Sequence, residues 1–132
     1  MLKSIKRVYL PAEAGDGLRV LVDRLWPRGL ARDKAHVDLW LRDIAPSGAL
    51  RKWFGHDVLR WDAFRVRYLA ELQDATPAQE LQRLRELCLD RSAVTLLYAA
   101  HDEAHNNAMV LRELLMEGVA PDALGAGAES RP

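Results

Sequence analysis

The stretch Leu18-Arg19-Val20-Leu21-Val22-Asp23-Arg24-Leu25-Trp26-Pro27-Arg28-Gly29 decides the fold, because an apolar run turns there into a charged loop. Val20, Leu21 and Val22 are consecutive and apolar, which predicts a strand buried on both faces of a sheet. Ionic side chains follow directly, around a turn that contains proline. In open α/β sheets, ligands bind beyond the carboxyl ends of the strands. The stretch therefore predicts a central strand with a binding site at its end.

Length and composition limit the classes of protein that fit. The 132 residues suffice for one domain with a real core. Nineteen basic and 19 acidic residues give no formal net charge, which argues against a general nucleic-acid or membrane surface but allows a local basic patch. Cys88 is the single cysteine, so neither an intrachain disulfide nor a zinc cluster is expected. The chain has no apolar run of the ~18 residues that a membrane span needs and no apolar core of a signal peptide near Met1, so we expect a cytoplasmic protein.

The rest of the chain alternates strands with helices. Further strands are predicted over Ile5–Leu10 and Val94–Ala99, and residues 34–45 favour an extended segment over a helix. Helices are predicted over Gly48–Phe54 with Ser47 as N-cap and Gly55 as stop, and from the cap Asp57 to about Gln73. Two more are predicted from the cap Thr76, with Pro77 at the first helical position, to Leu89, and from about Glu103 to Glu117. We therefore predict a single three-layer α/β domain over residues 1–120, with a small, mostly parallel sheet flanked by helices, and a flexible C-terminal tail over residues 121–132.

Asp23, Arg24 and Arg28 form the first group of candidate site residues. Two guanidinium groups on one loop can clamp a phosphate or carboxylate through paired hydrogen bonds, and the Asp23 carboxylate can orient one of them. The alternative is a structural Asp–Arg pair packed over Trp26. The loop lacks the repeated glycines of a Walker or dinucleotide-binding loop.

The second group, His101-Asp102-Glu103-Ala104-His105-Asn106-Asn107, follows the Val94–Ala99 strand. The start of a helix presents free N–H groups, so this turn can bind an anion, with Asn106 as a ligand contact and His105 for proton transfer. The alternative is that Asp102 only caps the helix. His101 and His105 have a spacing that can hold a metal, but no third ligand is evident and we expect no metal.

The third group comprises Ser47, Arg51, His56 and Asp57. Arg51 can assist in binding an anion, and His56 beside Asp57 can serve as an oriented general base. The alternative is that these residues cap two neighbouring helices. Ser47 lacks the Gly-x-Ser-x-Gly elbow of a nucleophile, so we count it as a ligand contact only.

Four separated motifs resemble the YeaO-like branch of the domain-of-unknown-function family 488, from about Ile5 to Leu115. They are Val22-Asp23-Arg24-Leu25-Trp26-Pro27-Arg28-Gly29, Leu50-Arg51-Lys52-Trp53-Phe54-Gly55-His56-Asp57, Trp61-x-x-Phe64-x-x-Arg67-Tyr68, and Val94-Thr95-Leu96-Leu97-Tyr98-Ala99-Ala100 leading to His105-Asn106-x-Ala108. The resemblance implies an α/β fold and a small cytoplasmic protein, and it brings no established activity. Longer relatives carry Asp-Val-Arg where this chain has Asp23-Arg24, and Cys-His-Arg near His105-Asn106-Asn107. This chain lacks that Cys and the following Arg.

These observations predict a pocket at the carboxyl ends of the two apolar strands, for a small anionic ligand such as a phosphate-bearing one. Arg24 and Arg28 hold the anion, Arg51 assists, and Asp23 orients an arginine. His56, His105 and Asp23 are the candidate catalytic residues if the protein is an enzyme, a question that the sequence leaves open together with any cofactor and the oligomeric state. The alternative function is a nucleic-acid- or protein-binding regulatory module without catalysis, with nucleic acid the less expected partner.

Overall fold

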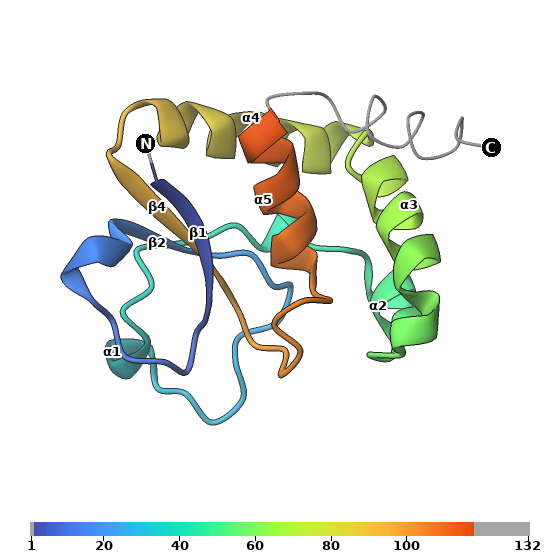
Figure 1. Ribbon diagram of the computed structural model, residues 1–132, viewed down its shortest axis with the longest axis horizontal. Coiled ribbons are helices and arrows are strands. Elements are labelled where there is room, and N and C mark those ends of the chain that lie inside the picture. Colours follow the sequence, from blue (N-terminus) through green and yellow to red (C-terminus); the bar gives the residue numbers. More distant parts are fainter. Residues whose placement is uncertain (1, 118–132) are drawn as a thin grey trace.

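The computed structural model describes residues 2–117, and a four-stranded parallel sheet lies at its centre (Figure 1). The strands are β1 (Leu2–Arg7), β2 (Leu18–Leu21), β3 (Leu39–Trp40) and β4 (Ala93–Tyr98), in the order β1-β4-β2-β3. Leu21 of β2 pairs with Leu97 of β4, so the two apolar strands lie side by side and end together. Their residues are buried on both faces of the sheet, as their sequences predict.

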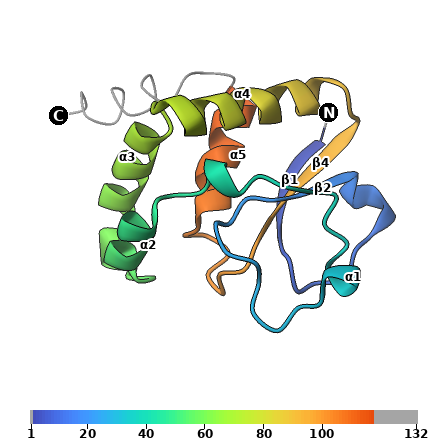
Figure 2. The ribbon, with the colours of Figure 1, turned by 180° about the vertical axis from the view of Figure 1, so that it is seen from behind.

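Helices flank the two faces of the sheet unequally (Figures 1 and 2). Side chains from α2 (Gly48–Phe54), α3 (Trp61–Glu71), α4 (Ala75–Leu89) and α5 (Asn107–Glu117) join the main core with Val20, Val94 and Leu96. The opposite face, with Leu21 and Leu97, is covered by loop residues that include Trp26 and Leu30, beside the short α1 (Arg32–Ala35). The predicted α/β domain with a parallel sheet is therefore confirmed. The predicted tail, residues 121–132, lies outside the described residues.

Several predicted element bounds are confirmed and others are wrong. Helix α2 begins and ends as predicted, with the Ser47 hydroxyl accepting the Leu50 N–H and Gly55 left-handed at φ 53°. Asp57 caps a short 3₁₀ turn, η3 (Val58–Arg60), that leads into α3. Helix α4 starts at Ala75 with Asp74 at its N-cap position, so Thr76 lies inside the helix and the predicted cap at Thr76 is wrong.

The chain between residues 31 and 45 differs most from the extended segment that we predicted. It forms α1, then the two-residue β3, then a 3₁₀ turn, η2 (Arg42–Ile44). Strand β1 ends at Arg7 because the Leu10 N–H bonds back to the Arg7 carbonyl in a turn. None of the helices within residues 2–117 is long and apolar enough to cross a membrane.

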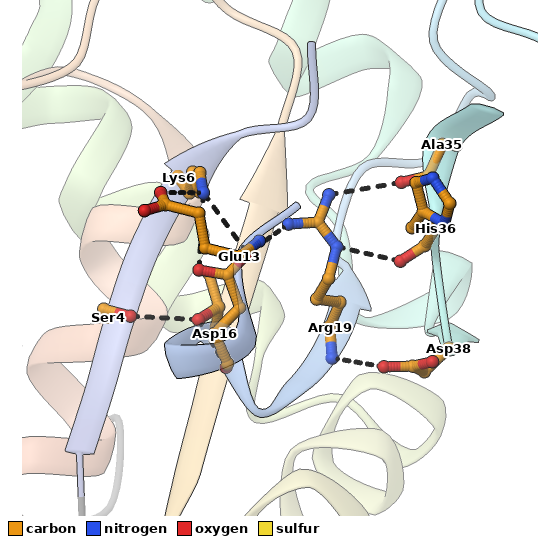
Figure 3. Close-up of polar contacts among 9 residues, drawn as sticks. Ser4, Lys6, Glu13, Asp16, Arg19, Ala35, His36 and Asp38 are labelled. Atoms are coloured by element: carbon orange, nitrogen blue, oxygen red, sulfur yellow. Dashed lines mark hydrogen bonds and ion pairs between the residues drawn. The ribbon is translucent and has the colours of Figure 1, made fainter. Parts of the chain in front are cut away.

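A buried ionic network joins the loops and α1, which cover the face of the sheet that carries Leu21 and Leu97, to the sheet itself (Figure 3). The Arg19 side chain comes from β2, and the residue is only 4% exposed. Its guanidinium donates to the Asp16 carboxylate at 2.5 Å and to the His36 carbonyl at 2.8 Å. The Lys6 ammonium bonds the same Asp16 carboxylate at 3.2 Å. The network thereby fixes the 3₁₀ turn η1 (Ala14–Asp16) and the end of α1 on the sheet.

The hydrogen-bond partners of the Asp16 carboxyl group stabilise its ionised form, although the group is buried. Burial alone raises its pKa, but hydrogen bonds from the Glu13 N–H, Arg19 and Lys6 together lower the pKa below the ordinary 3.8. Gly17 follows at φ 64°, and a Cβ atom there would lie 2.1 Å from the Ala93 carbonyl oxygen. Only glycine therefore fits between the network and β4.

Candidate functional site

A cavity of about 610 Å³ opens at the carboxyl ends of β1, β2 and β4. The loops after β2 and β4 supply most of its polar side chains, and the segment from Ala45 to His56 supplies another wall. Ligands of open α/β sheets bind at this edge. Of the site residues named from the sequence, the cavity lining includes Asp23, Arg24, Arg28, Arg51, His56, His105 and Asn106.

Asp23 ties the ends of the two central strands together. Its Oδ2 atom accepts the Ala99 N–H at 2.9 Å, and its carbonyl accepts the Trp40 indole N–H at 2.7 Å. Burial raises the pKa of Asp23, and the Ala99 N–H and the positive charge of Arg51 offset that shift only in part. Among the described residues Asp23 forms no ion pair with an arginine, so the predicted orienting role does not match its geometry.

The three arginines of the cavity differ in how far they are committed to the protein. Arg24 donates its Nε and Nη2 groups to the Pro46 and Ala45 carbonyls, both at 3.1 Å, and so holds the neighbouring loop. Arg28 and Arg51 are exposed, and within residues 2–117 their guanidinium groups make no hydrogen bond or ion pair. Arg28 and Arg51 are therefore the cavity arginines with uncommitted guanidinium groups, whereas the sequence analysis names Arg24 and Arg28 as the residues that hold an anion and Arg51 as an assistant.

Asp102 and His105 form a carboxylate–imidazole pair at the cavity edge. The Asp102 Oδ1 atom accepts the N–H groups of Ala104 and His105 at 2.9 and 3.0 Å, and Oδ2 lies 2.9 Å from His105 Nδ1. The Ala104 N–H and the His105 side chain hold the pKa of Asp102 below its usual range. The His105 ring also stands edge-on to Trp61, with 5.3 Å between ring centroids. When Nδ1 donates to Asp102, Nε2 is left as the ring atom that exchanges a proton or hydrogen bond with a ligand.

The sequence did not reveal this pair, because a helix predicted from about Glu103 puts Asp102 at its N-cap position. The helix instead begins at Asn107, since Asp102 holds residues 102–105 in a turn. The three-residue spacing between Asp102 and His105 was the signal available in the sequence. His56 also departs from its predicted role, because Asp57 accepts the Leu59 N–H and lies 3.7 Å from Arg60 rather than pairing with His56.

Ser47 and Asn106 serve the fold rather than offering free groups to a ligand. Ser47 lies outside the cavity lining, and its hydroxyl donates to Glu71 at 2.6 Å while it caps α2. Asn106 lines the cavity but is 3% exposed. Its Oδ1 accepts the Met109 N–H and its Nδ2 donates to the Asp102 carbonyl, both at 3.0 Å. The Ser47 hydroxyl is therefore engaged by Glu71 and the Asn106 amide is already occupied, and ligand contact by either residue stays a prediction.

Aromatic rings form the apolar wall of the cavity. The Phe54 and Phe64 rings stack with centroids 4.4 Å apart and planes 27° apart. Trp26 lines the other side, and its indole N–H donates to the Leu30 carbonyl at 2.7 Å. Within residues 2–117 no cluster of three or more His, Cys, Asp or Glu side chains could hold a metal ion.

Comparisons with known proteins identify relatives of unknown function. A family model described as "Inactive DUF488-N3 subclade" matches residues 3–132. The "Uncharacterized protein YeaO" of Escherichia coli (strain K12) is 46% identical over 110 residues, which cover 83% of this chain and 93% of the relative. The "Uncharacterized protein Rv3073c" of Mycobacterium tuberculosis (strain H37Rv) is 42% identical over 111 residues, which cover 84% and 91%. No solved structure matches the chain significantly.

Proposed function

The chain belongs to the inactive DUF488-N3 subclade, and from this premise we propose that it binds, without turnover, a small ligand that joins a phosphate-type anion to a flat apolar group. The description of the subclade as inactive favours binding over catalysis. The only cysteine, Cys88, is buried in the main core and burial raises the pKa of its thiol, so it offers no nucleophile at the cavity.

The two uncommitted guanidinium groups carry the proposal. Arg28 comes from the loop after β2 and Arg51 from α2, and both line the same cavity. An unpaired guanidinium presents up to five N–H donors in a planar fork that matches a phosphate or carboxylate. Arg24, fixed by the Ala45 and Pro46 carbonyls, adds a third positive charge to the same cavity. A single anionic group can thus meet cations from separate elements of the fold.

The aromatic wall of the cavity supports the other half of the proposal, namely that the ligand carries a flat apolar group. Phe54 and Phe64 offer a fixed apolar surface opposite the loop that carries Trp26. A volume of about 610 Å³ falls inside the ~300–1,000 Å³ range of small-molecule sites. A flat ring against the aromatic side chains, with its anionic group toward the arginines, uses both halves of the lining.

Isothermal titration calorimetry with deoxyadenosine monophosphate as the probe tests the proposal. We expect binding of this nucleotide, and much weaker binding of deoxyadenosine, which lacks the anion. Arg51→Ala is expected to weaken nucleotide binding about ten- to a hundredfold, the loss that follows when ~1.5–3 kcal/mol of charged hydrogen bonding is removed. Arg83→Ala is the matched control, because Arg83 is exposed on α4 away from the cavity lining. Equal affinity for nucleotide and nucleoside, or equal losses in the two variants, would contradict the proposal.

A further inference from the structure

We propose that the natural ligand is an unpaired end of a single-stranded nucleic acid, whose terminal nucleotide occupies the cavity while the next phosphates lie on a neighbouring ridge. The ridge consists of Trp26, Arg28, Arg32, Trp40 and Arg42, and we call it the arginine ridge. The inference rests on the proposed function in one respect, namely that the cavity accepts a nucleotide. It adds the class of molecule to which that nucleotide belongs.

The arginine ridge is continuous with the cavity through Trp26 and Arg28, which line both. The Arg32 guanidinium carbon lies 4.3 Å from the Trp26 ring centroid and 5.4 Å from that of Trp40. The Arg42 guanidinium carbon lies 4.9 Å from the Trp40 centroid. The guanidinium carbons of Arg32 and Arg42 both lie near the Trp40 ring, so their separation is at most the sum of these two distances. Two cations this close together can contact neighbouring phosphates of one strand.

The two indole rings hold these cations in fixed positions. Trp26 donates its indole N–H to the Leu30 carbonyl and Trp40 donates to the Asp23 carbonyl, each at 2.7 Å. The rings also meet each other at 69°, with centroids 5.5 Å apart. Stacking occupies the flat face of a guanidinium and leaves its in-plane N–H groups for other partners. A stacked arginine is thus already ordered before a phosphate arrives, which reduces the entropy lost on binding.

The charge around the arginine ridge fits a polyanion. Arg28, Arg32 and Arg42 are exposed, and in the part of the chain that the structure describes their guanidinium groups form no ion pair. Residues 23–52 contain seven Lys or Arg and four Asp or Glu, although the whole chain has no net charge. The positive excess is therefore concentrated on the segment that builds the cavity and the ridge, which is the footprint expected for phosphate groups.

A single strand fits this surface better than a duplex. Tyr9 lines the cavity, is 40% exposed, and donates its hydroxyl to the Arg28 carbonyl at 2.9 Å. An exposed aromatic ring such as that of Tyr9, beside a track of cations, is a feature on which a base of a single strand stacks. Asp23 and Ala99 line the cavity at the strand ends, and a terminal base that enters the cavity beside them leaves its stack.

Titration of the full chain with a short oligodeoxyadenylate, followed by tryptophan fluorescence at several salt concentrations, tests the inference. We expect the oligonucleotide to bind more tightly than deoxyadenosine monophosphate and than a duplex of the same length. The double variant Arg32→Ala/Arg42→Ala should weaken oligonucleotide binding about tenfold or more and reduce the slope of log K against log salt by about 1.4, the value for two lost phosphate contacts on a single strand. Its affinity for the mononucleotide should stay unchanged, which also shows that the variant is folded.

The matched control is Arg83→Ala/Arg91→Ala, which removes two exposed positive charges from α4 and from the turn at the amino end of β4. This variant should bind the oligonucleotide like the wild type. Equal losses in the two double variants, or a duplex that binds as tightly as the single strand, would overturn the inference. Mononucleotide binding without tighter oligonucleotide binding would also overturn it and leave the cavity proposal intact. Oligonucleotide binding that depends on the arginine ridge, without any mononucleotide binding, would support the ridge and refute the cavity proposal.

Discussion

Replacement of Asp23 separates the two roles of its carboxylate, as a hydrogen-bond acceptor and as a charge. Asp23 accepts the Ala99 N–H at 2.9 Å, and burial raises its pKa above the ordinary 3.8. For a group whose pKa is raised by folding, the stabilising contribution is complete below the unfolded pKa and is lost as pH rises through the folded value. At neutral pH the ionised carboxylate therefore opposes folding, although it still accepts the Ala99 hydrogen bond.

Two substitutions give opposite results under this reasoning. Asp23→Asn keeps an acceptor for the Ala99 N–H and removes the charge, so we expect the free energy of unfolding at neutral pH to rise by up to about 1 kcal/mol. Asp23→Ala also removes the charge, but it takes away the acceptor of the Ala99 N–H, which costs about 2 kcal/mol, so we expect a net loss of about 1 kcal/mol relative to the wild type. The two variants should thus differ by about 2 kcal/mol, or roughly 8 °C in Tm at about 4 °C per kcal/mol.

Urea unfolding of the wild type and both variants, at neutral pH and near pH 4, measures these differences. The advantage of Asp23→Asn over the wild type should shrink as pH falls, because the wild-type carboxyl group becomes protonated. A wild type that is more stable than Asp23→Asn at neutral pH would refute the reasoning. That result would mean that the Asn107 side chain, Arg51 and His56 compensate the buried charge fully.

Three further predictions concern the fold and the cavity edge. Gly17→Ala places a Cβ atom 2.1 Å from the Ala93 carbonyl oxygen at a φ of 64°, so chemical denaturation should show a loss of about 3 kcal/mol or more; a loss below about 1 kcal/mol would show that the turn rearranges freely. Hydrogen bonds from the Glu13 N–H, Arg19 and Lys6 outweigh burial and lower the pKa of Asp16, so its contribution is present above the ordinary pKa of 3.8 and is lost as pH falls through the folded value. The wild type should therefore lose more stability than Asp16→Asn on acidification below about pH 4 in thermal unfolding, and parallel curves would contradict the network in Figure 3. Asp102→Ala removes the partner of His105 Nδ1, so ¹⁵N NMR of the imidazole should show a change in the proton distribution between Nδ1 and Nε2, whereas an unchanged spectrum would indicate that Asp102 does not set the tautomer.

The sequence predicted the central strands and the α2 caps because their causes are local. Val20, Leu21 and Val22 are apolar without interruption, and a strand with that pattern must be covered on both faces. Ser47 stands before the helix, where a side-chain oxygen can accept a free backbone N–H. Gly55 stands after it, where a left-handed residue ends the helix. The location of the cavity followed in turn, since parallel strands end at one edge.

The sequence could not show which arginines are free, because that depends on carbonyl groups from distant parts of the chain. Arg24 is held by the carbonyls of Ala45 and Pro46, more than twenty residues away, and nothing near Arg24 in sequence signals them. Arg51 remains uncommitted only because no described acidic group reaches it within ion-pair distance. Arg19 gave a local signal that was missed, since its spacing of three residues from Asp16 allowed a pair across the turn that Gly17 makes.

Chemical-shift mapping of the ¹⁵N-labelled chain with deoxyadenosine monophosphate tests most directly whether the cavity between the strand ends binds an anionic ligand. We predict that the backbone amides that shift belong to residues 23–28, 51–56 and 99–107, the three segments that surround the cavity, and that the exposed face of α4 is unaffected. Shifts confined to α4, or no saturable shifts at all, would contradict the central claim.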